Sequence, residues 1–452
     1  MNLSFIRYLK YRNIQDRITY LKWYNFIERS QWWTMEENDN YQWNKVKQLL
    51  EYAYDNIPYY KELFIKLGAT PNDIKTWSDF RKIPYLTKEI VREKSDDLIP
   101  RNIKKSKLRY HTTGGSTGIP LGFYKLREEQ MIEHAFMFHQ WGRVGYKETS
   151  KRVILKAQPL KNNKLFIKFR FTNDWFMSSR LLSKEYIKQY VVFLNHIKPE
   201  FFHVHPSCFF KFTQLLIASK LNLNFYPKAV LCGSEPVFDY QRDLFEKIYK
   251  TRVYTWLGLA EGTTLAGECE YSKSFHVWPQ YSYVELVDKN DMPVNKKGLV
   301  GAIIGTNLKS LDTPFIRYKS EDLATLGSNK CNLCGRNHMI FDTIEGRKQD
   351  VIIMADGGEL LVALIPHMIA HEFNNALNGI KMMQIIQEVK GEILIKFSIT
   401  NDFNKADEAK IRAIIKSACH DQLSVKFEYS DDFIRSKSGK RILFIQKIKN
   451  IN

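Results

Sequence analysis

The middle of the chain alternates between strand-like and helix-like patterns, and this alternation restricts the fold more than any other feature. Residues 152–157, 201–205 and 229–232 are short apolar runs of the kind found in buried strands. Between and after them, apolar residues recur at helical spacing over 187–197 and 241–248. We expect the second helix to start near Pro236, because proline suits a position just inside the start of a helix. Strands that alternate with helices predict an α/β fold with a largely parallel sheet.

The pattern changes from residue 281 onwards. Two alternating runs, 281–287 and 299–306, flank a polar turn and predict an antiparallel β layer. Beyond residue 350, strand-like runs near 351–354, 383–389, 392–399, 425–429 and 442–445 accompany a helical pattern over 411–418, which predicts a small α+β domain. A helix should also lead up to Ile57-Pro58. We expect a large domain over 1–347, with a helical lead-in over about 1–95, and a small domain over 348–452. A chain of 452 residues is long enough for both.

The loop from 113 to 120 reads T-G-G-S-T-G-I-P and has the composition of a phosphate-binding turn. Glycines allow backbone N–H groups to point inward, and the hydroxyl side chains add donors. The loop lacks the G-K-[ST] of a Walker sequence, and a Gly/Thr-rich turn alone is more often an ordinary loop. Its candidate phosphate ligands are Thr113, Gly114, Gly115, Ser116, Thr117 and Gly118.

A second candidate site combines three cysteines with a histidine. Cys331 and Cys334 form a C-x-x-C pair, and Cys269 precedes His276 by seven positions. Three thiolates and one imidazole suit a tetrahedral Zn²⁺ ion, which in a closed four-ligand site is structural. The competing interpretation is four unrelated reduced side chains. His338 is a substitute ligand that we discount because it lies beyond Arg336.

The chain carries a formal net charge of +19, which suits a polyanionic partner such as a nucleotide, nucleic acid or anionic membrane. We favour a solvated Lys-rich surface, with the basic run 101–109 serving a nucleotide, and expect no nucleic-acid partner. No apolar run is long enough to span a bilayer, and the N-terminus is not a signal peptide. That N-terminal segment either packs on the protein or lies at a membrane interface, so we expect a cytoplasmic protein with at most peripheral membrane contact.

Six short motifs in a fixed order resemble those of adenylate-forming enzymes. They are the loop 113–120, G-S-E-P at 233–236, W-L-G-L-A-E at 256–261, R-Y-K-S-E-D at 317–322, G-R-x-x-D at 346–350 and S-G-K at 438–440. Near the N-terminus, 50–60 and 84–88 are similar to phenylacetate–CoA ligases and to their relatives, the deazaflavin-adenylating synthetases and the CapK-like proteins of capsule biosynthesis. The resemblance covers residues 45 to 445.

The resemblance implies a large adenylate-forming domain with a mobile small domain, hinged at 347–350. It also implies catalytic roles for three residues. Glu261 would hold Mg²⁺, Arg347 would lie beside the ribose, and Lys440 would reach in from the small domain and neutralise charge as the carboxylate attacks the α-phosphate. The implied ATP-binding residues are Thr113–Gly118 for the β/γ-phosphates, Gly233, Ser234, Glu235, Tyr254 and Trp256 for the adenine and acyl pocket, and Asp322 for the ribose hydroxyls.

Three positions depart from the family pattern. Ile119 occupies a position where Lys is common, Ala260 replaces a Ser or Thr, and Glu321 replaces the Gly before Asp322. We expect Ile119 to remove a charge near the phosphates and Glu321 to add bulk and negative charge near the ribose.

The favoured function is ATP-dependent adenylation of a small carboxylic acid, amino acids included, followed by transfer to an acceptor. The acceptor is a sugar or sugar nucleotide in capsular or O-antigen polysaccharide biosynthesis, or coenzyme A as in phenylacetate–CoA ligase. Two other readings stay open: AMP transfer to an acceptor hydroxyl, and a non-catalytic nucleotide-binding protein. The implied cofactors are ATP, Mg²⁺ and structural Zn²⁺, with coenzyme A as an alternative acceptor. A homodimer is common among the relatives.

Overall fold

The computed structural model describes residues 14–448 except 113–120, 157–159, 161–163, 170–171, 312, 348–350, 363–364, 367, 370–378, 401–402, 420 and 435–441. By its internal contacts the chain forms two compact units. Unit 1 comprises Met1–Glu148 and Trp256–Ile344, and unit 2 comprises Thr149–Thr255 and Glu345–Asn452. Residues 345–452 belong to the same unit as 149–255, so this division does not test the predicted domain boundary at 347/348, which stays a prediction.

Unit 1 begins with helices. These are α1 (Ile14–Ser30), α2 (Met35–Asn56), α3 (Pro58–Lys66), α4 (Trp77–Phe80), α5 (Lys88–Glu93) and, further along, α6 (Glu128–Trp141), with short 3₁₀ turns at Pro71–Asp73, Lys105–Lys107 and Gly142–Val144. Thr34 and Glu37 form a reciprocal capping box at the start of α2. Pro58, which has no N–H to donate, ends α2 and occupies the first position of α3. The predicted helix before Ile57-Pro58 is confirmed.

Helix α1 is buried on one face only. Its Tyr20 and Ile27 lie in a cluster with Phe136 of α6. On the other face Ile14, Ile18 and Leu21 are exposed. The described part of the N-terminal segment thus packs on the protein's own surface, and residues 1–13 lie outside the described residues.

Most neighbouring strands in the sheet of unit 1 run antiparallel. Its strand order is β11 (Ser282–Val287), β12 (Val300–Asn307), β13 (Tyr318–Leu326), β14 (Ile340–Arg347), β10 (Phe275–Val277), β9 (Leu265–Glu268) and β8 (Arg252–Gly258). The predicted antiparallel layer is confirmed for β11 and β12, which pair in register from Ser282↔Asn307 to Val287↔Ala302. A separate hairpin, β1 (Leu108–Thr112) and β2 (Gly122–Leu126), flanks the loop 113–120 on both sides.

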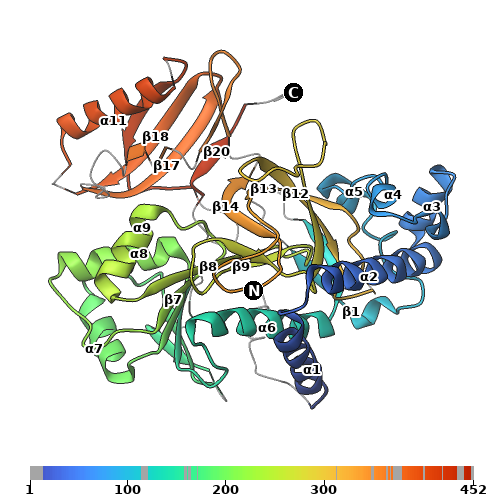
Figure 1. Cartoon of the computed structure of the whole chain (residues 1–452). Coiled ribbons are helices and arrows are strands. Elements are labelled where there is room, and N and C mark those ends of the chain that lie inside the picture. Colours follow the sequence, from blue (N-terminus) through green and yellow to red (C-terminus); the bar gives the residue numbers. More distant parts are fainter. Residues whose placement is uncertain are drawn as a thin grey trace. The chain divides into compact units, whose positions relative to one another are not determined.

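The first part of unit 2 is the predicted α/β layer. Strands β7 (Ala229–Cys232), β6 (Phe201–Val204), β3 (Arg152–Lys156) and β5 (Asp174–Ser178) are parallel, and β4 (Phe166–Lys168) is an antiparallel edge strand. Helices α7 (Ile187–Ile197), α8 (Pro206–Ala218) and α9 (Asp239–Tyr249) lie beside this sheet (Figure 1, green) and share its core. Helix α9 begins at Asp239, so Pro236 precedes the helix instead of lying inside it.

Strand β8 changes its pairing along its length. Residues 252–255 pair in parallel with β7, and residues 256–258 pair antiparallel with β9. The chain therefore passes from a parallel to an antiparallel sheet within one strand, just before the segment that carries Glu261.

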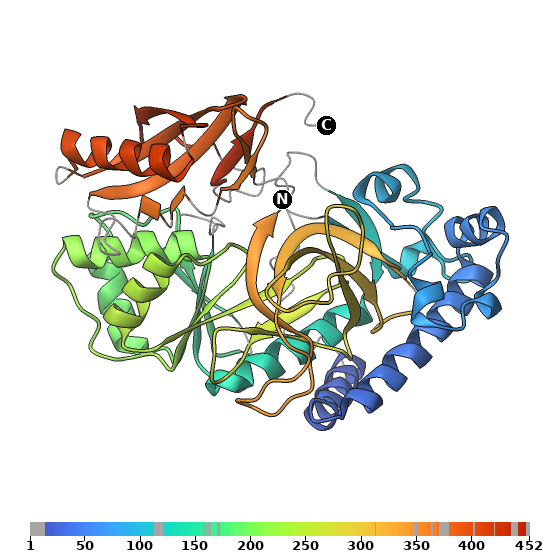
Figure 2. The ribbon, with the colours of Figure 1, turned by 45° about the horizontal axis from the view of Figure 1, so that its top comes forward.

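The C-terminal part of unit 2 has a core of its own. A four-stranded sheet has the order β19 (Ser424–Tyr429), β18 (Glu392–Ile399), β17 (Ile380–Val389) and β20 (Phe444–Gln446), and a small hairpin joins β15 (Val351–Ile353) to β16 (Glu359–Leu361). Helix α11 (Lys405–Ala418) lies along one face of the sheet and buries Ile411 and Ile415 against it (Figures 1 and 2). This is the α+β arrangement that the sequence predicted. Among the described helices, none is long and apolar enough to cross a membrane.

Unit 2 contains a buried ion pair whose disruption should be costly. Arg152 of β3 donates to both carboxylate oxygens of Asp174 on β5, at 3.0 and 2.7 Å. Asp174→Ala leaves a buried guanidinium without this partner, so we expect the free energy of unfolding in urea to fall by about 3–5 kcal/mol. Lys228→Ala is the control, because the Lys228–Glu200 pair (2.7 Å) is largely exposed and its loss should cost about 1 kcal/mol or less. Equal losses in the two variants would contradict this assignment.

Candidate functional site

The connection between β8 and β9 holds the predicted acid, Glu261. The turn is closed by two backbone hydrogen bonds, from Leu259 N–H to Thr264 O (3.1 Å) and from Gly262 N–H to Leu259 O (2.9 Å). Glu261 is buried, and its Oε1 accepts a 2.7 Å hydrogen bond from the Tyr318 hydroxyl. A single carboxylate suits Mg²⁺, which is usually held by one or two carboxylates together with phosphate and water oxygens.

Strand β13 supplies the predicted ribose ligand, Asp322, which is buried and donates its N–H to Ser320 Oγ at 3.2 Å. Ala302 and Ile304 of β12 pair with Leu323 and Lys319, so three residues of β13 lie opposite one residue of β12. Such bulges redirect side chains and are common beside active sites. The structure thus places Glu261, its partner Tyr318 and Asp322 in unit 1, the last two on one bulged strand.

Glu321, the residue in the family's glycine position, has a left-handed backbone. Its φ of 68° is one that glycine adopts without strain and other residues rarely adopt. Its carboxylate forms an ion pair with Lys88, the last residue of the N-terminal P-Y-L-T-K segment. The added negative charge that the sequence predicted is therefore paired with an ammonium group.

Arg317, which opens the R-Y-K-S-E-D motif, has a structural role. Its guanidinium donates to Glu285 at 3.0 and 3.3 Å and also to the backbone oxygens of Arg81 and Ile83. Leu86 forms an isolated parallel bridge with Tyr318. The helical lead-in is thereby attached to the start of β13.

In unit 2, Gly233, Ser234 and Glu235 follow the end of β7. Ser234 has a φ of 68°, and Glu235 Oε2 accepts the Ser207 N–H at 3.0 Å, at the start of α8. Glu235 Oε1 also lies 3.7 Å from His205 Nδ1. Glu235 thus caps a helix, a contact that the sequence did not indicate.

The two aromatic residues predicted for the adenine and acyl pocket lie on β8. Tyr254 has no exposed surface. The half-buried Trp256 packs against Trp141 of unit 1, with ring centroids 5.3 Å apart.

Several predicted residues cannot be placed in this way. The loop Thr113–Gly118, Asp350 and Lys440 lie outside the described residues, and Arg347 is described only as the last residue of β14. Their roles stay predictions.

The predicted cysteine–histidine cluster is present. The ligand atoms of Cys269, His276, Cys331 and Cys334 all lie within 4.8 Å of one another. Cys269 Sγ is 3.8 Å from Cys331 Sγ, and Cys334 Sγ is 3.6 Å from His276 Nε2. Tetrahedral zinc with Zn–S near 2.3 Å and Zn–N near 2.05 Å requires S–S and S–N separations of about 3.8 and about 3.6 Å, so these two distances match the ion, and three thiols with one imidazole are a donor set that zinc prefers.

The surroundings of the cluster suit a metal site as well. Burial lowers the pKa of His276 far below its usual value, which keeps the imidazole neutral, as a metal ligand must be. Arg336 binds both oxygens of Glu270 at 2.6 and 2.8 Å, next to Cys269. His338 is buried near His276, with ring centroids 5.6 Å apart, but it does not belong to the four-residue cluster.

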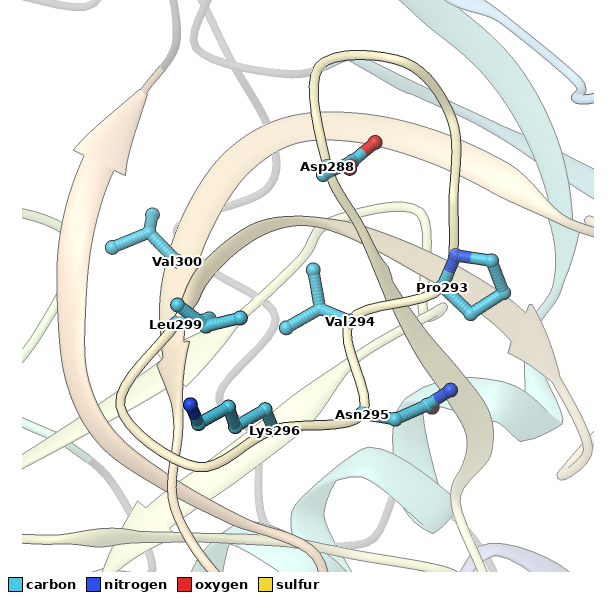
Figure 3. A pocket seen from close by; sticks show the side chains of 7 residues that line it. All are labelled: Asp288, Pro293, Val294, Asn295, Lys296, Leu299 and Val300. Atoms are coloured by element: carbon cyan, nitrogen blue, oxygen red, sulfur yellow. The ribbon is translucent and has the colours of Figure 1, made fainter.

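A concave surface also lies in the β11–β12 connection of unit 1 (Figure 3). None of the predicted site residues lines it. Its lining residues are Asp288, Pro293, Val294, Asn295, Lys296, Leu299 and Val300.

Sequence reasoning missed several residues that hold the site together. Tyr318 and Lys88 lie inside the motifs 317–322 and 84–88. The sequence therefore indicates that the two residues belong to the site, but it does not show which side chains they contact. Lys125, Glu129 and Lys309 also surround the Glu261 turn, and no motif contains them.

The comparisons with known proteins find the same groups of proteins that the motifs resemble. Residues 361–447 match the CapK C-terminal domain. Protein CapK of Staphylococcus aureus is 23% identical over 90% of this chain and 88% of its own length. Phenylacetate-coenzyme A ligase of Thermus thermophilus is 22% identical over 72% of this chain and 75% of its own.

Among solved structures, 2-hydroxyisobutyryl-CoA ligase in the postadenylation state, in complex with R3-HIB-AMP, has a TM-score of 0.74 at 18% identity. The match covers 93% of this chain and 91% of that one. The same ligase with 2-HIB-AMP and CoA in the thioesterification state has a TM-score of 0.60 at 19% identity, over 93% and 92% of the two chains. The fold is therefore that of the adenylate-forming ligases, as the sequence predicted.

The backbone at Glu321 gives a stability prediction. Glu321→Ala and Glu321→Gly both remove the carboxylate that pairs with Lys88, but only Gly relieves the left-handed strain. We expect the Gly variant to be more stable than the Ala variant by about 1 kcal/mol in urea unfolding. An Ala variant as stable as the Gly variant would show that the backbone at this position is not strained.

Proposed function

We propose that this chain, a relative of CapK and of the phenylacetate–CoA ligases, activates a carboxylic acid with ATP and transfers the acyl group to an acceptor. In the first step a carboxylate oxygen attacks the α-phosphorus of ATP, pyrophosphate leaves, and a mixed acyl–AMP anhydride forms. In the second step the acceptor attacks the acyl carbon and AMP leaves. The observation that carries the proposal is the similarity to these proteins over most of both chains, together with a buried Glu261 and Asp322 in their motif positions.

Each candidate residue would have a separate role in the adenylation step. Asp322 would accept hydrogen bonds from the ribose, the loop Thr113–Gly118 would bind the β/γ-phosphates, and Lys440 would offset charge at the α-phosphate. Glu261 would hold Mg²⁺, which when bound would offset part of the negative charge of the triphosphate. The segment Gly233–Glu235, Tyr254 and Trp256 would form the adenine and acyl side, where Glu235 acts by shaping the loop, because its carboxylate already caps α8.

The acceptor separates two versions of the proposal. The CapK-type C-terminal domain favours a sugar, sugar nucleotide or similar acceptor in capsular or O-antigen polysaccharide biosynthesis in the cytoplasm. The phenylacetate-coenzyme A ligase relatives favour coenzyme A. Purified protein supplied with ATP, a panel of acids and either coenzyme A or an amino sugar distinguishes them by the mass of the product. An acceptor that gains AMP and no acyl group would replace both versions with nucleotidyl transfer.

The zinc site is proposed as structural. Zinc at the Cys269/His276/Cys331/Cys334 cluster would connect the end of β9 and β10 to the loop before β14, because these elements carry the four ligands. It would stabilise unit 1 without contacting substrate.

Metal analysis tests this assignment. Purified protein should contain about one zinc ion per chain, and Cys331→Ser should lower both the zinc content and the melting temperature. Cys419→Ser, which changes a buried cysteine outside the cluster, should leave the zinc content unchanged. A Cys331→Ser protein that retained its zinc would refute the site.

Substitution of Lys440 tests the adenylation step. Lys440→Ala should reduce acid-dependent exchange of labelled pyrophosphate into ATP by about 10²-fold or more, because a charge-stabilising donor is lost from the transition state. Lys437→Ala removes a lysine from the same S-K-S-G-K segment and should exchange like the wild type. Wild-type exchange by the Lys440 variant would mean that this residue does not act in adenylation.

A further inference from the structure

Two lysines bind the backbone on either side of Glu261. Lys125 Nζ, from β2, donates to the Ala260 carbonyl oxygen at 2.7 Å. Lys309 Nζ, from the segment after β12, donates to the Gly262 carbonyl oxygen at 2.9 Å. The carbonyl groups just before and just after the predicted magnesium ligand are therefore each held by an ammonium group.

Glu129 of α6 is the counter-ion shared by both lysines. Its Oε2 lies 3.9 Å from Lys125 Nζ and 3.7 Å from Lys309 Nζ, and its Oε1 accepts a hydrogen bond from the Thr313 hydroxyl. The Lys309 side chain has no exposed surface, and that of Glu129 is 3% exposed. Charges buried to this degree require partners, so the three side chains depend on one another.

Further contacts fix the Lys309 ammonium in place. It donates to Asn307 Oδ1 at 3.2 Å and lies over the Tyr281 ring, 4.3 Å from its centroid. The Tyr281 hydroxyl in turn donates to Glu133 at 2.5 Å. Burial and the nearby Lys125 charge lower the pKa of Lys309 to about 8, although Glu129 and Glu133 oppose this shift.

The turn itself is shaped to admit the two ammonium groups. Gly262 has a φ of 75°, and a Cβ built there would lie 2.2 Å from Lys309 Nζ and 3.1 Å from Lys125 Nζ. Thr263 and Thr264, which follow, are fully buried. A side chain at position 262 would displace both lysines, so the glycine and the lysines form one arrangement.

We propose that Lys125 and Lys309, held by Glu129, are positioning residues that clamp the segment 260–262 and thereby fix the Glu261 carboxylate for Mg²⁺–ATP. The catalytic part of this inference rests on the proposed function. Buried ion pairs contribute little net stability compared with apolar residues of similar size. Hydrogen bonds from charged donors to backbone oxygens, in contrast, hold a turn in a single geometry, which a pre-organised metal ligand requires.

Lys309→Met tests the clamp, because it removes the ammonium and keeps most of the side-chain volume. The Gly262 and Leu259 amides, which close the turn, should exchange hydrogen about tenfold faster or more. In pyrophosphate exchange, the apparent KM for Mg²⁺ should rise by about the same factor while the KM for the acid changes little. Lys66→Met, at an exposed pair with Glu62 in α3, should change neither measurement.

The double variant Lys309→Met/Glu129→Gln separates positioning from charge balance. Removing the Glu129 charge also takes this carboxylate away from Lys125, so it should restore only part of the melting temperature lost in Lys309→Met, while fast amide exchange and the raised KM for Mg²⁺ persist. If the double variant regained wild-type amide protection and KM, Lys309 would serve only to neutralise Glu129 and the proposal would be overturned. If wild-type protein showed no pyrophosphate exchange with any acid, the proposed function would fail, and amide exchange would still decide whether the clamp exists.

Discussion

The structure depends on buried ion pairs. A charged side chain in the interior loses its hydration, so it requires an oppositely charged partner, and here the partner comes from another segment of the chain. Arg152 and Asp174 join two neighbouring strands of unit 2. Arg317 and Glu285 fix the start of β13 and also hold the backbone of the helical lead-in. Lys309 and Glu129 bring the segment after β12 against α6. The last two pairs set the positions of segments that carry, or lie beside, a candidate site residue.

Around Glu261, buried charged side chains hold the turn that carries the predicted Mg²⁺ ligand. The turn between β8 and β9 is short, its glycine admits two ammonium groups, and Tyr318 contributes a hydroxyl to the carboxylate. Asp322 lies on the strand that carries Tyr318, at a bulge where Glu321 is left-handed and paired with Lys88. Residues that could bind a nucleotide's metal and ribose are thus built on strands and a braced turn, which maintain geometry better than long loops.

Much of this fold could be predicted from periodicity. Strand β18 and helix α7 match their expected ranges, and β7 agrees residue for residue, because each is a clear apolar run or helical stripe. Strands β9 and β10 were missed because they are short and their burial depends on neighbours far along the chain. The cysteine–histidine cluster was found because its ligand types and spacing are rare in combination.

Other features of the candidate site have no local sequence signal. The left-handed Glu321 looked only like a departure from a motif, since a single residue type does not reveal its φ angle. Lys125, Glu129 and Lys309 resemble surface charges in a Lys-rich chain until the fold buries them together. The role of Glu235 as a cap for α8 likewise requires the tertiary contact between the loop after β7 and the first turn of α8.

The central claim is that a carboxylate becomes an acyl–AMP anhydride, and oxygen transfer tests it most directly. The protein is incubated with ATP, an acceptor and a carboxylic acid labelled with ¹⁸O in its carboxylate. The mass of the AMP produced is then measured by mass spectrometry. Adenylation leaves one carboxylate oxygen on phosphorus when the acyl group departs, so the account predicts AMP that carries a single ¹⁸O. Unlabelled AMP, formed at the same rate with and without the acid, would contradict it.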